Sequence, residues 1–449
     1  MQLANYYRSL LQRLPALSVD ADKVRALHSA AAFRERLLTL IATAQTRICL
    51  VALYLQDDDA GREILTALHQ AKQANPTLDV RLYVDFHRAQ RGLIGHAGQG
   101  GNHLMYQEFA ERYEHPIAIH GVPVKGRELL GVLHLKGFVF DDTLLYSGAS
   151  INDIYLHQNG RYRFDRYHEI TDAGLADAML DYVDRLFAHN PAVPALNQPE
   201  IPTARRLRQP IRQFRHRLRR GQYQFEHQPR QPGEVAVTPL AGLGKRGNKL
   251  NRAIRTMVRG TKEKLFVCTP YFNLPKSLAR DIRSQLKKGR EVTLVIGDKT
   301  ANDFYIPPDE PFRTIGGLPY LYEANLRRFA RSNQTFIYQG KLHIMLWRHD
   351  HNSYHLKGLF VDDDLAMITG NNLNPRAWGL DLENGLLLQD PEHRLRATFE
   401  QEKANILQHC RRLTHFTEIE QLGDYPEPVQ RLLKRVQRTQ ANVLLKRLL

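Results

Sequence analysis

The chain has 449 residues, of which 43% are apolar and 24% charged, an ordinary globular balance with room for two domains. The 63 Lys and Arg exceed the 47 Asp and Glu by 16, which favours an anionic partner such as a nucleic acid, an acidic membrane surface or a phosphorylated substrate. Three cysteines without metal-type spacing argue against a disulfide scaffold, and neither a signal peptide nor a membrane-spanning run is recognisable.

The predicted elements occur twice along the chain. Each half contains, in the same order, a buried strand, an amphipathic helix, a second strand and, much later, a third strand that carries the tetrapeptide HLKG. Such a repeat predicts one ancestral unit used twice, with an α/β layered fold in each half. The matched pairs are 47–55 with 264–272, the helices from Arg62 and Ser277, 79–85 with 291–298, and 131–142 with 352–364.

A composition change marks the boundary between the halves. Residues 195–235 are rich in Pro, Gln and Arg, as expected of a linker. We therefore predict a first half at 1–200, a basic linker or amphipathic helix at 201–235, and a second half at 236–449 that ends in a basic helix.

Both third strands carry the motif H-x-K-x-x-x-x-D. The copies are His134, Lys136 and Asp141, and His355, Lys357 and Asp362. Residues i and i+2 of a strand share a face, so each His lies beside its Lys in an otherwise apolar strand, where polar side chains need partners. A single copy could equally be a satisfied core histidine, but two copies in register with a repeat favour a functional site.

A small polar turn follows each motif strand, and a glutamate follows each turn. The turns are SGASIND at 147–153 and TGNNLNP at 369–375, and the glutamates are Glu169 in RYHEI and Glu383 in DLENGLLL. This pattern resembles the phospholipase D superfamily, in which a G-S-x-x-N-like turn follows the motif. Ala149 and Asn371 stand where that consensus has Ser.

The resemblance implies two phospholipase D-type α-β-α halves packed around a pseudo-twofold axis with one shared active site. It also implies phosphoryl transfer in which one His forms a phosphohistidine and the other is the acid/base. Family precedent favours His134 as nucleophile and His355 as acid/base, although the symmetry of the sequence cannot choose between them. No metal or cofactor is expected.

The supporting residues are implied in the same way. Lys136 and Lys357 would hold phosphoryl oxygens as cations, and Asn152 and Asn374 would add neutral donors. Carboxylate support crosses between halves in the family, so Glu383 would serve His134 and Glu169 would serve His355. Asp141 and Asp362 would be structural.

A finer resemblance covers nearly the whole chain. The stretches TPYFNLP, IGDKTANDFYIPPDEPF, LPYLYEANLRRF and ITGNNLNPRAWGLDLENGLLL are similar to the phosphatidylserine synthases of Gram-negative bacteria. The implied substrates are CDP-diacylglycerol and L-serine, and the products are phosphatidylserine and CMP, with some hydrolysis by water. The choice of serine rests on the resemblance alone.

Polar residues follow the second strand in each half, where ligand sites form in α/β layers. In the first half these are Asp85, Arg88 and Arg91, whose arginines could bind the diphosphate of the substrate. The corresponding place in the second half holds Lys299, Asn302, Asp303 and Tyr305, which could bind nucleotide or serine.

Residues 205–220 contain eight Arg and no acidic residue. Leu207, Ile211, Phe214 and Leu218 are spaced as one helical face, which predicts a basic amphipathic helix on anionic lipid, although a solvated linker helix has the same pattern. The expected membrane contacts are Arg212, Phe214, Arg215, Leu218 and Arg219. The stretch from Pro428 onward repeats the pattern, as a lipid-facing helix or one packed on the protein body.

The expected location is the cytoplasm, peripherally associated with the inner face of the cytoplasmic membrane. Another phospholipase D-type transferase or hydrolase, such as a cardiolipin synthase or a phospholipase, remains an alternative. A superfamily nuclease is a further one, but aromatic and basic residues are little interleaved and no nucleic acid is expected. Two intact motifs argue against a purely binding protein. The oligomeric state, a homodimer included, stays open.

Overall fold

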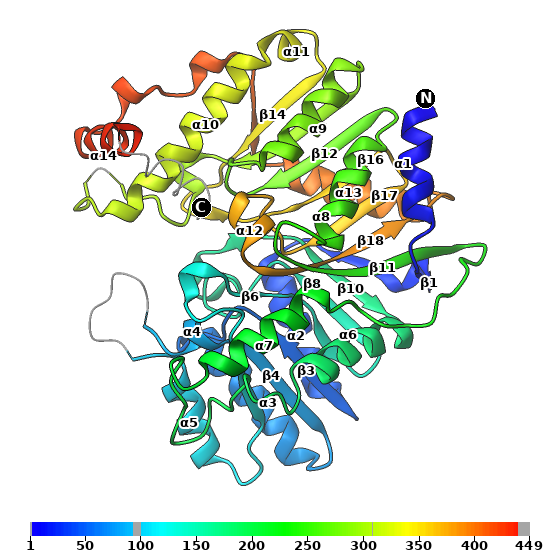
Figure 1. Ribbon diagram of the computed structural model, residues 1–449, viewed down its shortest axis with the longest axis vertical. Coiled ribbons are helices and arrows are strands. Elements are labelled where there is room, and N and C mark those ends of the chain that lie inside the picture. The colour runs from blue at the N-terminus through cyan, green and yellow to red at the C-terminus, as the bar shows by residue number, and fades with distance from the viewer. Residues whose placement is uncertain (1, 93–99, 308, 439–449) are drawn as a thin grey trace.

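A computed structural model describes residues 2–92, 100–307 and 309–438. The chain forms two α/β halves stacked along the long axis, with the strands β6 (Leu133–His134) and β18 (Leu382–Gln389) near the junction (Figure 1). The α/β class and the duplication predicted from the sequence are confirmed.

The first half is built on a seven-stranded mixed sheet. Its core strands β3 and β4 are parallel and are joined by helix α3 (Asp59–Ala74), as expected of a βαβ unit. The strands in spatial order are β2 (Val24–Leu27), β10 (Tyr167–Thr171), β8 (Thr143–Ser147), β7 (Phe138–Phe140), β3 (Arg47–Val51), β4 (Asp79–Asp85) and β5 (Ala118–Val122).

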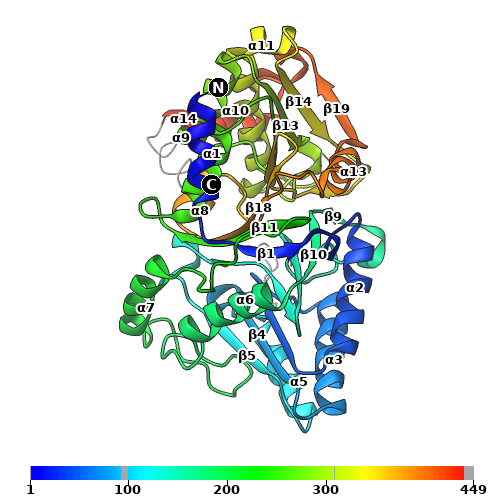
Figure 2. The ribbon, with the colours of Figure 1, turned by 90° about the vertical axis from the view of Figure 1, so that its right-hand side faces the viewer.

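Helices cover both faces of this sheet (Figure 2). Helix α2 (Ala30–Thr43) lies with α3 on one face, and α6 (Ala173–Leu186) lies on the other, beside α7 (Arg208–Arg220). The remaining helices of this half are α4 (Phe86–Ala89) and α5 (His103–Arg112).

The second half repeats this plan in a ten-stranded sheet. Strands β12, β13 and β14 are parallel, as β3, β4 and β5 are in the first half. The path runs β1 (Leu17–Asp20), β11 (Glu234–Leu243), β18, β17 (Leu365–Thr369), β16 (Gly358–Val361), β12 (Lys264–Thr269), β13 (Glu291–Gly297), β14 (Leu342–Trp347) and β19 (Cys410–Leu413), with β6 paired to β18 off this path.

The helices of the second half also divide between two faces. Apolar side chains of α8, α9 and α10 form one buried cluster, whereas those of α13 join the core that continues into the first half. The helices are α8 (Lys249–Arg259), α9 (Lys276–Lys287), α10 (Leu318–Ser332), α11 (Gln334–Tyr338), α12 (Pro375–Gly379), α13 (Arg396–Leu407) and α14 (Glu427–Arg438).

The N-terminal segment belongs to the second half, which corrects the predicted boundary at residue 1. Strand β1 pairs with β11 of the second sheet, and α1 (Gln2–Gln12) packs beside α8 (Figure 2). Arg8 of α1 forms ion pairs with Asp362 and Asp364. The spacing of the repeat gave no sign of this exchange, because the segment has no counterpart at the start of the second half.

Two short pairings join the halves at their junction. Strand β6 runs parallel to β18, with His134 opposite Glu383. Strand β9 (Arg163–Phe164) of the first half runs parallel to β15 (Ser353–Tyr354) of the second. Both motif histidines therefore lie at or directly after a strand that pairs with the opposite half.

Helix α7 exists as predicted, but its apolar face is not free to meet lipid. Ile211, Phe214 and Leu218 are 4%, 1% and 1% exposed, respectively, and the Phe214 ring packs edge-on against Phe187. Phe214 and Leu218 are therefore core residues rather than membrane contacts, because the helix closes the open face of its own half. Helix α14 covers the predicted C-terminal helix as far as Arg438, and residues 439–449 lie outside the described part of the chain.

Candidate active site

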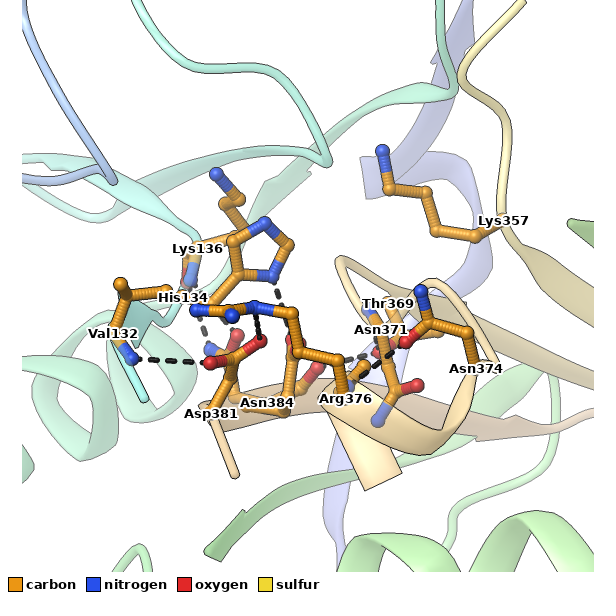
Figure 3. Close-up of polar contacts among 12 residues, drawn as sticks. Val132, His134, Lys136, Lys357, Thr369, Asn371, Asn374, Arg376, Asp381 and Asn384 are labelled. Carbon is orange, nitrogen blue, oxygen red and sulfur yellow. Dashed lines mark hydrogen bonds and ion pairs between the residues drawn. The ribbon is translucent and has the colours of Figure 1, made fainter. Parts of the chain in front are cut away.

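The two motifs meet at the junction of the halves. His134, Lys136, His355 and Lys357 are all at least nine-tenths buried. Figure 3 shows His134 and Lys136 facing the same space as Lys357 and Asn374, which come from the opposite half. One site with two histidines and two lysines is what the resemblance implied.

Each motif lysine passes over the glycine that begins the turn of the opposite half. A Cβ added to Gly148 would lie 2.4 Å from Lys357 Nζ, and one added to Gly370 would lie 2.7 Å from Lys136 Cγ. Only glycine leaves room for these side chains. The turn motif therefore requires glycine because the lysine of the opposite half passes directly over this position.

His134 is held by the second half, as predicted. Its Nδ1 lies 2.8 Å from Oε2 of Glu383, whose side chain is fully buried. Asn384 also holds the backbone of Lys136, since its Oδ1 accepts from Lys136 N and its Nδ2 donates to Lys136 O, both at 2.8 Å. These contacts leave Nε2 of His134 as the nitrogen that can face a substrate.

His355 is held differently, which corrects the assignment of Glu169. Its Nδ1 lies 3.1 Å from Oδ2 of Asp165 and 2.9 Å from the hydroxyl of Tyr155. Lys357 Nζ contacts both His355 Nδ1 and Asp165 Oδ2, the latter at 2.7 Å. Glu169 instead forms a bidentate ion pair with Arg36.

The sheet register explains this correction. In the second half Gly385 of β18 pairs with Thr369, and Glu383 lies two residues earlier. In the first half Tyr167 of β10 pairs with Ser147, the residue that matches Thr369, so the counterpart of Glu383 is Asp165. Asp165 is found when the two halves are aligned on Ser147 and Thr369, the residues that precede the turns, and on the strands that pair with them. It is missed when Glu383 is matched to the nearest glutamate of the first half.

Burial shifts the pKa values of the four central cationic groups in one direction. Burial, followed by Lys136 and Lys357, holds the pKa of His134 well below its ordinary value. Burial and Lys357 lower the pKa of His355 to about 4. Burial and Lys357 likewise lower the pKa of Lys136 to about 7, and burial lowers the pKa of Lys357. An anion placed among these groups would restore their charged forms.

The two supporting carboxyl groups differ from each other. Burial, and then the nearby Asp381, raise the pKa of Glu383 well above its ordinary value. Burial would also raise the pKa of Asp165, but the charges and hydrogen bonds of Lys357 and His355 outweigh it and hold that pKa low. Asp165 is therefore the carboxyl group that ionises more readily of the two.

The motif aspartates lie away from the histidines and bind backbone. Asp141 accepts N–H bonds from Gln45, Thr46 and Arg47 at the start of β3. Asp362 accepts from Lys262, Glu263 and Lys264 at the start of β12. Each carboxylate thus ties its motif strand to the strand that begins the repeat in its own half, β3 or β12, in agreement with a structural role.

The turn asparagines use their side-chain oxygens locally. Asn152 Oδ1 accepts from Tyr155 N, and Asn374 Oδ1 accepts from Ala377 N at the start of α12. Neither amide nitrogen has a protein partner among the described residues, so the N–H₂ groups remain available as donors, and that of Asn374 points towards Lys357 in Figure 3. Lys136 Nζ donates to Ser150 Oγ at 3.3 Å.

Of the three candidate residues after β4, one is free to bind a ligand. Both oxygens of Asp85 accept backbone N–H groups, including that of Leu133 next to His134, so Asp85 anchors β6 rather than facing substrate. Arg91 is engaged in a bidentate pair with Glu128. Arg88 is 7% exposed and its Nη1 has no partner.

The matching residues of the second half are less directly placed. Lys299 forms ion pairs with Glu323 and Glu420, and Asn302 Oδ1 accepts from Phe304 N. Tyr305 packs near Tyr320. In the same stretch, Asp303 binds Arg163 and Tyr271, and Tyr271 lies edge-on to His355 with ring centroids 5.9 Å apart.

The arrangement supports covalent phosphoryl transfer. Two buried, neutral imidazoles are each oriented by a carboxyl group at Nδ1, which leaves Nε2 for nucleophilic attack or proton transfer. Two lysines stand ready to bind non-bridging oxygens. Within the described ranges, no group of three or more His, Cys, Asp or Glu is arranged to hold a metal ion.

This fold and site define the class of phospholipase D-like enzymes. The protein-family model described as "Cardiolipin synthase, PLD-like domain" matches residues 254–403 of the chain. The chain is 47% identical over 443 residues to the CDP-diacylglycerol–serine O-phosphatidyltransferase of Haemophilus influenzae, covering 98% of this chain and 97% of the relative. It is 46% identical over 448 residues to that of Escherichia coli, covering 99% and 98%, respectively.

A solved structure agrees with these relatives. The crystal structure of phosphatidylserine synthase from Haemophilus influenzae Rd KW20 matches with a TM-score of 0.96 and 46% identity, over 99% of this chain and 100% of that one. The chain belongs to the CDP-diacylglycerol–serine O-phosphatidyltransferase family, a group of transferases also called phosphatidylserine synthases.

Proposed function

We propose that this chain transfers the phosphatidyl group from CDP-diacylglycerol to L-serine and releases CMP and phosphatidylserine. The observation that carries the proposal is the pair of buried histidines, each oriented at Nδ1 by a carboxyl group from the opposite half. Relatives that cover almost the whole chain bear the corresponding name, and their names supply the two substrates.

In the first step His134 Nε2 attacks the phosphorus next to the diacylglycerol. The P–N bond forms as the bond to the CMP oxygen breaks. His355, which holds a proton while the anionic substrate is bound, supplies that proton to the leaving CMP. Lys136 and Lys357 balance the charge on the non-bridging oxygens, and Asn152 and Asn374 add N–H donors. The product of this step is a phosphatidyl-histidine.

In the second step His355, now neutral, accepts the proton of the serine hydroxyl. The serine oxygen attacks phosphorus, the P–N bond breaks, and His134 returns to its neutral state. Asp165 and Tyr155 hold Nδ1 of His355 in both steps. Water in the place of serine would give phosphatidic acid by the same route.

We further propose that the chain works at an anionic membrane surface, on the cytoplasmic face. A diacylglycerol substrate stays in the bilayer, so the enzyme must approach it there. No helix within the described ranges is long and apolar enough to cross a bilayer. Docking at the surface would serve instead.

A groove of about 690 Å³ beside α7 fits such docking. It is lined by Lys125, Arg127 and arginines of α7 and the segment before it, and none of these cations has an ion pair with a carboxylate among the described residues. Leu130, which also lines the groove, and its neighbour Leu129 are 45% and 60% exposed and precede His134 in the chain. The arginines of the groove are Arg127, Arg205, Arg208, Arg212, Arg215 and Arg219.

The reaction is tested with CDP-diacylglycerol in mixed micelles containing EDTA. CMP release that rises with L-serine, together with phosphatidylserine in the lipid extract, supports the proposal. CMP release that ignores serine would assign the chain to a hydrolase or to another acceptor. No CMP release alongside cleavage of DNA would favour a nuclease.

The membrane proposal is tested by sedimentation with vesicles. Vesicles with ~30% phosphatidylglycerol have a strong negative surface potential, so binding to them should fall with added salt. Binding to vesicles of pure phosphatidylcholine should be weak. The double variant R212Q/R215Q should bind less tightly while its melting temperature stays unchanged. Equal binding to both vesicle types would contradict an electrostatic surface.

A further inference from the structure

Arg88 is a buried cation without an anionic partner. It lies after β4, its side chain is largely enclosed, and its Nη2 donates to Gln56 Oε1 at 2.9 Å. Its Nη1 is buried and has no hydrogen-bond partner. A buried guanidinium with an unused donor is costly unless something binds it.

The carboxylates of this region are already occupied. Glu128 holds Arg91, Asp303 holds Arg163 and the Tyr271 hydroxyl, and Asp85 accepts backbone N–H groups. None of the ion pairs among the described residues includes Arg88. The missing partner of Arg88 is therefore an anion that the protein does not supply.

Arg88 is connected to the acid/base histidine through two tyrosines. Its Cζ lies 4.7 Å from the centre of the Tyr54 ring. Burial raises the pKa of Tyr54, and the nearby charge of Arg163 opposes that rise. The Cζ of Arg163 lies 4.5 Å from the centre of the Tyr155 ring, and the Tyr155 hydroxyl lies 2.9 Å from His355 Nδ1. Arg88 thus belongs to the same run of neighbouring side chains as Tyr155, which contacts His355.

We propose that Arg88 binds the carboxylate of the acceptor and so selects serine over amino alcohols and water. This inference rests on the proposed function, which requires the acceptor hydroxyl to meet His355. The donor phosphate has other partners, because Lys136 and Lys357 lie beside the histidines. A carboxylate on Nη1 would complete a charge-assisted pair in a buried site.

Such a pair explains how the site chooses its acceptor. Water and amino alcohols can reach His355, but they leave the guanidinium buried and unpaired. A site built to bind a charged group strongly rejects analogues that lack it. Arg88 is therefore a specificity-determining residue, and the acceptor class is an α-amino acid with a short hydroxyl side chain.

The test compares L-serine with serinol, which lacks the carboxylate, in Arg88→Met and the wild type. We expect the KM for serine to rise about 30- to 100-fold, on the order of 2 to 3 kcal/mol, while kcat/KM for serinol changes less than about threefold. CMP release without any acceptor should stay near the wild-type rate. Arg62→Met, which removes an exposed arginine of the same half, should change none of these values.

Each contrary result has a distinct meaning. Equal losses with serine and serinol would overturn the inference, and loss of acceptor-independent CMP release with an unchanged KM for serine would assign Arg88 to the donor diphosphate. If Arg88→Met does not fold, Arg88→Lys carries the test, with an intermediate KM for serine and an unchanged response to serinol. A wild type that makes no phosphatidylserine would refute the proposed function itself.

Discussion

The two motif histidines occupy equivalent places in a duplicated fold, yet their surroundings differ. His134 has one carboxyl partner, Glu383, which is fully buried beside Asp381. His355 has the shorter Asp165, the Tyr155 hydroxyl and its own motif lysine around the same nitrogen. The repeat has therefore kept the position of each carboxyl group but changed its chemistry.

This difference suits a division of labour. The low pKa of Asp165 keeps an anion beside His355, and an anion supports an imidazole that must carry a proton for part of the cycle. Glu383, whose pKa is raised, loses its proton less readily. A partner of this kind suffices for a histidine that must be neutral in order to attack. The asymmetry agrees with His134 as nucleophile and His355 as acid/base.

The strongest test separates the two histidines by the covalent intermediate. Both His134→Ala and His355→Ala should lower kcat at least about 10³-fold. With a CDP-diacylglycerol analogue whose leaving group needs no proton, His355→Ala should still form a phosphatidyl-enzyme that mass spectrometry detects, and His134→Ala should not. The reverse pattern would exchange the two roles.

A second test compares the supporting carboxyl groups. Asp165→Asn should lower kcat about 10²- to 10³-fold, because it removes the anion beside His355 and Lys357. Glu383→Gln should have a smaller effect, about 10- to 10²-fold, because the raised pKa of Glu383 means that less negative charge is lost with it. Steady-state CMP release measures both.

Glu169→Gln is the control for this pair. Glu169 binds Arg36 and not His355, so kcat should stay within about threefold of the wild type. A loss as large as that of Asp165→Asn would restore Glu169 to the catalytic set.

A third test concerns the crossing lysines. Gly148→Ala and Gly370→Ala should each lower kcat about 10-fold or more, because the added Cβ displaces Lys357 in one case and Lys136 in the other. The larger loss is expected for Gly148→Ala, where the Cβ meets the ammonium group itself. Gly423→Ala, with nothing within 4 Å, should leave the rate unchanged.

The smallest expected effect is on the pH dependence of stability. The pKa of His355 is about 4 in the folded chain, below its ordinary value of 6.5, so protonation favours the unfolded state. The stability contributed by neutral His355 is complete above pH 6.5 and is lost as the pH falls toward 4. In His355→Gln, the free energy of unfolding should therefore fall less steeply over this range, by about 1 kcal/mol per pH unit. Chemical denaturation at several pH values measures this, and parallel curves would contradict a neutral, buried His355.

Much of the site could be predicted from residues that lie close together in the sequence. The HLKG strands and the glycine-containing turns were predicted in this way, because a strand fixes the face of its side chains and a turn follows it directly. The contact between His134 and Glu383, which are 249 residues apart, was predicted from the resemblance to the phospholipase D superfamily. The partner of His355 was not, since Asp165 and Glu169 lie on the same strand and only its register with β8 decides which one reaches the site.

The sequence by itself determined the duplicated α/β fold, the four motif residues at the centre and the existence of a basic amphipathic helix at α7. The tertiary structure decided what those elements face. The apolar side of α7 covers its own half, α1 and β1 complete the second half, and Arg88 is left without an anion where Arg91 has one. Periodicity and local motifs specify which surfaces are apolar or charged, but packing between distant segments decides which of those surfaces are covered and which charges remain unpaired.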